Sequence, residues 1–232
     1  MLRSNPDADP SPPRSSAPSS GAGSRDTVFR RASTPGPLRE ATLGWLYLSL
    51  GSLGVATAAV LMVEKVRILQ DPTYVPSCSI NPILSCGSIM QTAQAEAFGF
   101  PNPILGIAGF GVIATVGAAI LAGGRFARWF WLGLLAGSTA GLVFVHWLAF
   151  QSLFRIGALC PYCMVVWVVT IAVFWYTLLH VVSTRESTRP SGFGAWCSRQ
   201  VIAYHGAVLT AWYLAFVGLI TVRFWEYWST LP

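Results

Sequence analysis

Five long hydrophobic stretches dominate the pattern of apolar and polar positions along the chain. Each can supply the roughly 20 helical residues that cross a hydrocarbon core of about 30 Å. The stretches run from about Thr42 to Val63, from about Asn102 to Ala122, from about Trp129 to Phe150, from about Cys160 to Val182 and from about Tyr204 to Phe224. Membrane-spanning strands alternate in hydrophobicity instead of forming continuous apolar runs. The pattern therefore predicts an all-α integral membrane protein.

The composition supports this prediction. The chain has 232 residues, of which 53% are hydrophobic and only 10% are charged. About a quarter of the residues of an average soluble protein are charged. So few charges cannot cover the surface of a soluble domain, which argues against a soluble enzyme or a nucleic-acid-binding domain.

The chain divides into two regions of different composition. Residues 1–40 are rich in Pro, Ser, Gly and Arg and show almost no apolar periodicity, which is typical of a disordered segment. We expect these residues to form a disordered cytoplasmic tail. Residues 41–232 are expected to form one five-helix membrane domain, with a long outer loop at 64–101.

The positions of the basic residues predict the orientation in the membrane. If the N-terminus is inside, eleven of the fifteen basic residues lie in the inner segments and four in the outer ones. Basic residues concentrate on the cytoplasmic side of membrane proteins. We therefore expect a multi-pass protein of the cell's inner (plasma) membrane with a cytoplasmic N-terminus and extracytoplasmic loops at 64–101 and 151–159.

This topology sorts the five cysteines. Cys78, Cys86, Cys160 and Cys163 fall on the extracytoplasmic side, whereas Cys197 lies in an inner loop and is expected to be an incidental thiol. Disulfides form and persist outside the cytoplasm. Two cysteine pairs on that side therefore indicate redox or structural bridges.

The motif Cys160-Pro161-Tyr162-Cys163 opens the fourth hydrophobic stretch. Pro161 suits the first position of a helix, where no N–H donor is needed. The positive end of the helix dipole faces the first cysteine, and such a placement lowers a thiol pKa and makes the pair reactive. The motif predicts a redox-active pair.

Seven residues separate Cys78 from Cys86 in the outer loop, which is expected to cap the bundle and to carry a short amphipathic helix over residues 88–98. This cysteine pair is either a static bridge that closes the loop or a shuttle that exchanges with a partner and with Cys160. The facing C-x-x-C pair favours the shuttle. The spacing does not match a structural zinc site, so no metal is expected.

The Cys-x₇-Cys pair after the first helix and Cys-Pro-Tyr-Cys at the start of the fourth together resemble the vitamin K epoxide reductase family, in its bacterial disulfide-forming branch. The resemblance covers roughly residues 41–185. It implies a four-helix transmembrane bundle around a quinone, with one peripheral fifth transmembrane helix.

The resemblance also implies roles for the four outer cysteines. Cys78 and Cys86 would pass electrons from a reduced partner to the C-x-x-C pair. Cys86 would exchange with Cys160, and Cys163 would be the thiolate nearest to the quinone ring.

Three further residues match positions of that family, and the resemblance implies that two of them, Asn102 and Trp167, bind the quinone. Asn102, in Phe-Pro-Asn-Pro at the start of the second stretch, matches an asparagine that hydrogen-bonds a quinone carbonyl. Trp167 stands where the family often has a tyrosine, and Thr92 replaces a family serine.

The expected function is to re-oxidise a separate extracytoplasmic thioredoxin-fold partner of the DsbA type and to pass the electrons to menaquinone or ubiquinone, in support of disulfide bond formation. The chain contains no nucleotide-binding glycine motif and no haem-attachment motif, so a membrane quinone is the expected electron acceptor. Two alternatives stay open. One is a vitamin K quinone or epoxide reductase driven by a thiol donor, and the other is a non-enzymatic membrane scaffold with structural disulfides.

The third stretch has two further features: a histidine with two competing interpretations, and a glycine repeat that is expected to permit close helix packing and to carry no chemistry. His146 is an intramembrane ionisable residue, so it is either a proton relay or a packed, hydrogen-bonded histidine. Gly133, Gly137 and Gly141 recur every four residues, which is typical of helices that pack closely.

Overall fold

The structure is a computed structural model that describes residues 40–81, 83–186, 200 and 203–229. The expected cytoplasmic tail lies outside the described residues except for Glu40. Cys197 also lies outside them.

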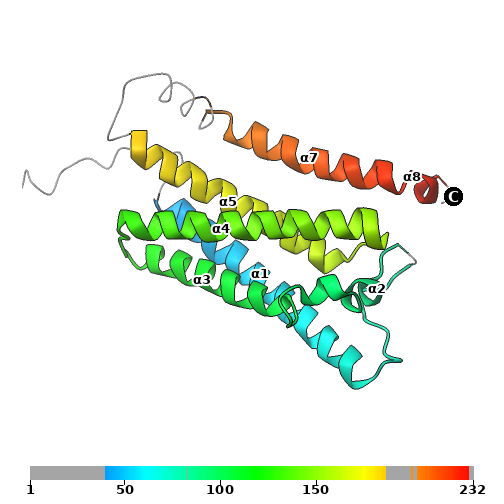
Figure 1. Ribbon diagram of the computed structural model, residues 1–232. Helices are drawn as coiled ribbons and strands as arrows, with labels where there is room; N and C mark the ends of the chain where they lie inside the picture. Colours follow the sequence, from blue (N-terminus) through cyan, green and yellow to red (C-terminus); the bar gives the residue numbers. More distant parts are fainter. Residues whose placement is uncertain (1–39, 82, 187–199, 201–202, 230–232) are drawn as a thin grey trace, which may run out of the picture. The chain divides into compact units, whose positions relative to one another are not determined.

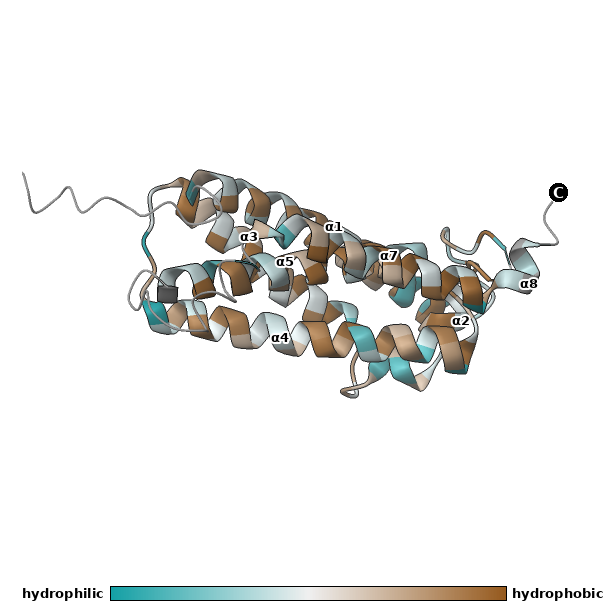
Figure 2. Ribbon diagram, turned by 90° about the horizontal axis from the view of Figure 1, so that it is seen from above, coloured by the Kyte–Doolittle hydropathy of each residue, from teal (hydrophilic) through white to brown (hydrophobic). Residues whose placement is uncertain are grey.

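The five predicted membrane helices are confirmed (Figure 1). They are α1 (Glu40–Gln70), α3 (Pro103–Leu121), α4 (Arg128–Phe150), α5 (Pro161–Glu186) and α7 (His205–Arg223). Each is long and apolar enough to cross a membrane. Hydrophobic residues occur along the whole length of all five helices (Figure 2). Within the described residues, four short elements accompany them: α2 (Cys86–Met90), the 3₁₀ turn η1 (Ala93–Glu96), the π-helical turn η2 (Gln151–Ile156) and α8 (Trp225–Trp228).

Helices α1, α3, α4 and α5 form the bundle. Its largest buried cluster joins Tyr47 of α1, Phe110 of α3 and Val173 of α5, and partly buried side chains of α4 such as Trp131 pack against it. The Tyr47 hydroxyl is hydrogen-bonded to Thr177 Oγ1 at 2.6 Å, so the one polar group of this cluster is satisfied.

Glycines bring α1 and α3 into close contact. A Cβ atom at Gly51 would overlap the backbone of Ala114, and one at Gly117 would overlap the backbone of Leu48. Only glycine permits backbones to approach this closely, because any side chain would occupy the contact.

The glycine stripe of α4 has a different role, and the expectation of close packing there is wrong. A Cβ at Gly133 or Gly137 would meet nothing within 4 Å, and one at Gly141 would meet only Thr170 at 3.7 Å. The stripe faces a cavity instead of a neighbouring helix. The missing side chains therefore create space.

Helix α7 is peripheral, as expected, and runs next to α5 (Figure 1). None of its residues is buried, and polar contacts attach it to the bundle. The Tyr213 hydroxyl donates to the Val168 carbonyl at 2.9 Å, and Arg223 Nε donates to the Leu153 carbonyl at 3.0 Å. The second bond places the end of α7 beside the end of α4.

His146 is one of these attachment points. The Trp212 indole N–H of α7 donates to His146 Nε2 at 3.3 Å, so the other ring nitrogen carries the proton and donates to the Leu142 carbonyl at 2.8 Å. Both ring nitrogens are occupied, and the residue does not line the cavity. The geometry favours the packed, hydrogen-bonded interpretation over the proton relay.

The outer loop is shorter than expected because α1 continues to Gln70. The loop packs against the last two turns of α1 and buries Glu64, Lys65 and Ile68 there. The single helix expected over residues 88–98 is divided into α2 and η1. The loop nevertheless packs on the bundle, since Cys86 and Met90 share a buried cluster with Leu61 of α1.

We expect Gly51→Ala to lower the free energy of unfolding by about 1–3 kcal/mol, the usual cost of forcing extra atoms into a packed site. The matched control is Gly111→Ala in α3, where a Cβ would meet nothing within 4 Å. That change should be neutral or stabilising, because alanine is the better helix former. Thermal unfolding in detergent micelles measures both, and equal unfolding temperatures would contradict the close α1–α3 contact.

Candidate redox site

The two loop cysteines form a disulfide, with their sulfurs 2.00 Å apart. Cys86 is the first residue of α2, whose N-terminus is capped by Ser85 Oγ. Both cysteines are buried, with Cys78 4% and Cys86 0% exposed. The disulfide is therefore buried, in one cluster with Leu61 and Ile68 of α1 and with Cys160.

A short main-chain bridge holds the loop against the start of α5. Leu84 pairs with Leu159 in a parallel bridge, in which the Leu159 N–H donates to the Ile83 carbonyl at 2.7 Å and the Ser85 N–H donates to the Leu159 carbonyl at 2.9 Å. Cys86 and Cys160 follow directly on the two paired segments. As a result their sulfurs lie 3.0 Å apart.

Cys160 and Cys163 are free thiols. The Cys163 N–H donates to Cys160 Sγ at 3.4 Å, which matches the expected effect of the helix start on the first cysteine. Hydrogen bonds from the Cys163 thiol and from the backbone N–H groups of Cys163 and Tyr162 lower the pKa of Cys160, although burial opposes the shift. The thiol whose pKa is lowered, Cys160, is thus also the one that touches the loop disulfide.

The structure brings together all four cysteines selected from the sequence. The sulfurs of Cys78, Cys86 and Cys160 lie within 4.8 Å of one another. Two of the three are bonded to each other. Such a contact between a thiol and a disulfide is the arrangement from which thiol–disulfide exchange proceeds.

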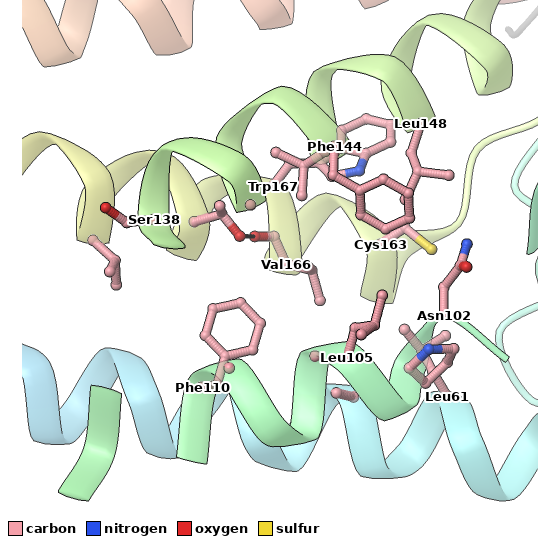
Figure 3. Close-up of a pocket in the computed structure, with 18 of the residues that line it drawn as sticks. Leu61, Asn102, Leu105, Phe110, Ser138, Phe144, Leu148, Cys163, Val166 and Trp167 are labelled. Carbon is pink, nitrogen blue, oxygen red and sulfur yellow. Dashed lines mark hydrogen bonds between the residues drawn. The ribbon is translucent and has the colours of Figure 1, made fainter. Parts of the chain in front are cut away.

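A cavity of about 590 Å³ lies between α1, α3, α4 and α5, beneath the outer loop. Its size is typical of small-molecule sites. Cys163, Asn102 and Trp167 all line it, and the Cys163 sulfur points toward the end where Asn102 lies (Figure 3). Most of the remaining wall is apolar, including Leu105 and Phe110.

Asn102 is held between the loop and α3. Its Nδ2 donates to the Gln94 carbonyl at 2.7 Å, and its Oδ1 accepts from the Ala97 N–H at 3.2 Å. An amide nitrogen has two N–H donors, and the Gln94 carbonyl takes one of them. The side chain therefore keeps a donor at a fixed position in the cavity wall.

Trp167 is buried one turn after Cys163 in α5. Its ring lies 6.2 Å from that of Phe216 in the peripheral helix α7. The indole thus forms part of the cavity wall and also contacts the fifth helix.

The α4 glycine stripe is the functional feature that the sequence analysis misassigned. Gly133, Gly137 and Gly141 all line the cavity, as do Gly106 and Gly109 of α3. The four-residue repeat was visible in the sequence, but close packing and an open cavity wall produce the same repeat. Only the position of the neighbouring helix distinguishes them.

Residues 45–178 match the sequence model of the vitamin K epoxide reductase family. This is more than half of the chain. The chain belongs to the vitamin K epoxide reductase family. The matched segment includes the four outer cysteines, Asn102 and Trp167, whereas α7 lies beyond it. Family membership and the five apolar helices make the protein a multi-pass membrane oxidoreductase. A comparison with curated proteins finds no match.

We expect alkylation of Cys160 to reach half its maximal rate at a lower pH than for an ordinary thiol, because only the thiolate reacts. Cys163→Ala removes the largest cause of the lowered pKa, the hydrogen bond from the Cys163 thiol, so the midpoint should rise. Labelling with iodoacetamide over a series of pH values, followed by peptide mass spectrometry, measures the midpoint.

The matched control is Tyr162→Phe. Residue 162 contributes only its backbone N–H to Cys160, which the substitution keeps. Its midpoint should stay that of the parent protein. An unchanged midpoint in Cys163→Ala would contradict the assigned cause.

Proposed function

We propose that the protein re-oxidises an extracytoplasmic thioredoxin-fold dithiol protein of the DsbA type and delivers the electrons to a membrane quinone, in support of disulfide bond formation. The observation that carries this proposal is the 3.0 Å contact between Cys86 Sγ and Cys160 Sγ, next to a cavity lined by Cys163. The sulfurs of Cys86, Cys160 and Cys163 thus form a series from the outer loop to an apolar cavity between the membrane helices, along which electrons can pass.

The first step transfers electrons from the partner to the loop. A partner thiolate attacks Cys78 Sγ of the loop disulfide, and Cys86 leaves as a thiolate. The second partner thiol then displaces Cys78, so that the partner gains a disulfide and the loop becomes a dithiol. Two electrons and two protons enter the loop pair.

The second step moves the electrons inward. The Cys86 thiolate attacks Cys160 of a Cys160–Cys163 disulfide, and Cys163 leaves as a thiolate. Cys78 then attacks Cys86, which restores the loop disulfide and releases Cys160. The lowered pKa of Cys160 favours its release, because a more acidic thiol leaves faster. The observed pairing, with Cys78–Cys86 bonded and Cys160 and Cys163 free, is the product of this step.

The residues around the cavity fit a quinone. When bound there, a quinone supplies a two-electron acceptor. The Asn102 amide keeps one N–H for a carbonyl oxygen, Trp167 provides an aromatic wall, and Cys163 lies at the same end of the cavity (Figure 3). Re-formation of the Cys160–Cys163 disulfide releases two electrons and two protons. Menaquinone and ubiquinone both have the ring and the apolar tail that such a site accepts.

The placement of the arginines supports an orientation with the N-terminus in the cytoplasm and the cysteines outside. Arg125 and Arg128 lie at the turn between α3 and α4. Arg223, whose Nε donates to the Leu153 carbonyl, lies at the other end of α4, which leads to the cysteines, and is one of the four basic residues expected outside. Together with the basic residues of 1–40, this distribution favours the inner (plasma) membrane with the redox loop on the extracytoplasmic side.

We expect Cys160→Ala to abolish quinone reduction with a thioredoxin-fold dithiol as electron donor, because Cys160 is the only thiol that touches the loop disulfide within the described residues. The measurement is the absorbance change of a soluble ubiquinone analogue. Cys197→Ala is the control and should keep the parent rate.

Retention of the parent rate by Cys160→Ala would refute the proposed electron route. If the Cys160–Cys163 pair also resisted reversible redox titration, the structural-disulfide alternative would be favoured. Product formation from added vitamin K epoxide, measured in the same assay, tests the epoxide reductase alternative.

We expect Gly137→Leu to raise the KM for the quinone by about tenfold, equivalent to about 1.4 kcal/mol of lost binding. The leucine would extend into the cavity, where a Cβ at this position meets nothing within 4 Å. The control, Ala136→Leu, alters a residue that lines the opposite face of α4. Equal KM values for the two variants would place the quinone elsewhere.

A further inference from the structure

Two adjacent residues of α1 with opposite charges, Glu64 and Lys65, are buried beneath the outer loop. Glu64 is 4% and Lys65 is 7% exposed. Side chains of these types are almost never fully buried unless they are paired. Their partners lie on the two sides of the loop disulfide.

Glu64 holds the segment that leads into Cys78. The Ser77 hydroxyl donates to Glu64 Oε1 at 2.6 Å. Ser77 directly precedes Cys78 in the chain. The second carboxylate oxygen, Oε2, is buried and has no hydrogen-bond partner among the described residues.

Lys65 holds the segment that follows Cys86. Its ammonium group donates to the Met90 carbonyl at 2.7 Å and pairs with Glu96 Oε1 at 2.9 Å. Met90 is the last residue of α2, the helix that begins at Cys86, and Glu96 belongs to η1. One ammonium group therefore fixes both short helices of the loop to α1.

The apolar residues on either side of this charged pair contact the same region. Leu61 and Ile68 belong to the buried cluster that contains Cys78, Cys86 and Cys160. The end of α1 thus holds both sides of the disulfide, in the position where Cys86 Sγ lies 3.0 Å from Cys160 Sγ.

This position suits transfer to Cys160 and prevents transfer from a partner. A protein thiol must contact a sulfur of the disulfide, and both loop cysteines are buried. The loop must therefore leave α1 before a partner can reduce the Cys78–Cys86 disulfide. It must return to α1 before Cys86 can reduce the Cys160–Cys163 disulfide.

We propose that Glu64 and Lys65 are positioning residues that fasten the redox loop to α1 and set the balance between the loop position that reduces Cys160 and the position that accepts electrons. The proposal rests on the shuttle role of Cys78–Cys86 stated above. It adds the residues that control access to this pair.

Polar attachments suit a loop that must detach. Replacing buried ion pairs by apolar side chains is often neutral or stabilising, so stability alone does not explain a buried lysine and a buried carboxylate with an unsatisfied oxygen. When the loop lifts, water can satisfy Ser77, Met90 and the ammonium group. Glu96 is already 39% exposed, so this attachment lies next to solvent.

Two rates test the proposal in the full-length protein. The first is the reduction of the Cys78–Cys86 disulfide by a water-soluble phosphine, measured with Cys160 and Cys163 both replaced by Ala. The second is the formation of a Cys86–Cys160 disulfide on addition of diamide, measured with Cys78 and Cys163 both replaced by Ala. The first rate reports how easily a reagent in water reaches the Cys78–Cys86 disulfide. The second rate reports how often Cys86 is in contact with Cys160.

We expect Lys65→Met to raise the first rate and to lower the second, each by about tenfold, because a hydrogen-bonded charge that holds the loop is lost. Ser77→Ala should change both rates in the same directions by releasing the Cys78 side. Because Ser77 lies at the surface, this second variant does not disturb the core. Lys65→Arg keeps the charge and the donors and should restore the parent rates.

The matched control is Arg128→Met, which removes an exposed basic residue at the start of α4, the end of the bundle away from the outer loop. Its loss should change both rates by less than about twofold. Parent-like rates in both Lys65→Met and Ser77→Ala, or an equal effect of Arg128→Met, would overturn the proposal. Neither rate involves a quinone or a partner protein, so failure here is distinct from a failed Cys160→Ala result.

Discussion

The main-chain bridge between Leu84 and Leu159 is the contact on which the redox site depends. It joins a loop that follows α1 to the residue before Cys160, and the 3.0 Å distance between the Cys86 and Cys160 sulfurs follows from it. Backbone hydrogen bonds suit this task because they do not depend on side-chain rotamers. The charged residues of α1 hold the rest of the loop. The main-chain bridge thus aligns Cys86 with Cys160, and Glu64 and Lys65 fasten the loop to α1.

Glycine is used in two opposite ways in the bundle. Gly51 and Gly117 let the backbones of α1 and α3 touch. Across the bundle, Gly133 and Gly137 of α4 leave space that no neighbour fills, and this space belongs to the cavity next to Cys163. Close helix contact and an open cavity wall therefore occur in the same bundle, both made by glycine.

The residues that were hardest to interpret from the sequence are those whose role depends on a distant neighbour. Glu64 and Lys65 fall in the expected outer loop at 64–101, yet α1 continues to Gln70 and the folded loop covers both residues. The position of His146 in its stretch allows either a proton relay or a packed histidine, and Trp212, 66 residues away, favours the second by bonding to its Nε2 atom. By contrast, the helices and the cysteine pairs follow from local patterns, because a continuous apolar run and a Cys-Pro-Tyr-Cys helix start have few alternative structures.

The amino-acid sequence by itself determined the membrane class, the five helices and the four cysteines, because these depend on hydrophobicity and on residues near one another in the chain. Family membership was recognisable from the same motifs. The tertiary structure decided which sulfurs touch, that the loop disulfide is buried, and that the α4 glycines face a cavity. These properties arise from contacts between segments tens of residues apart, and no local pattern records the distance between two such segments.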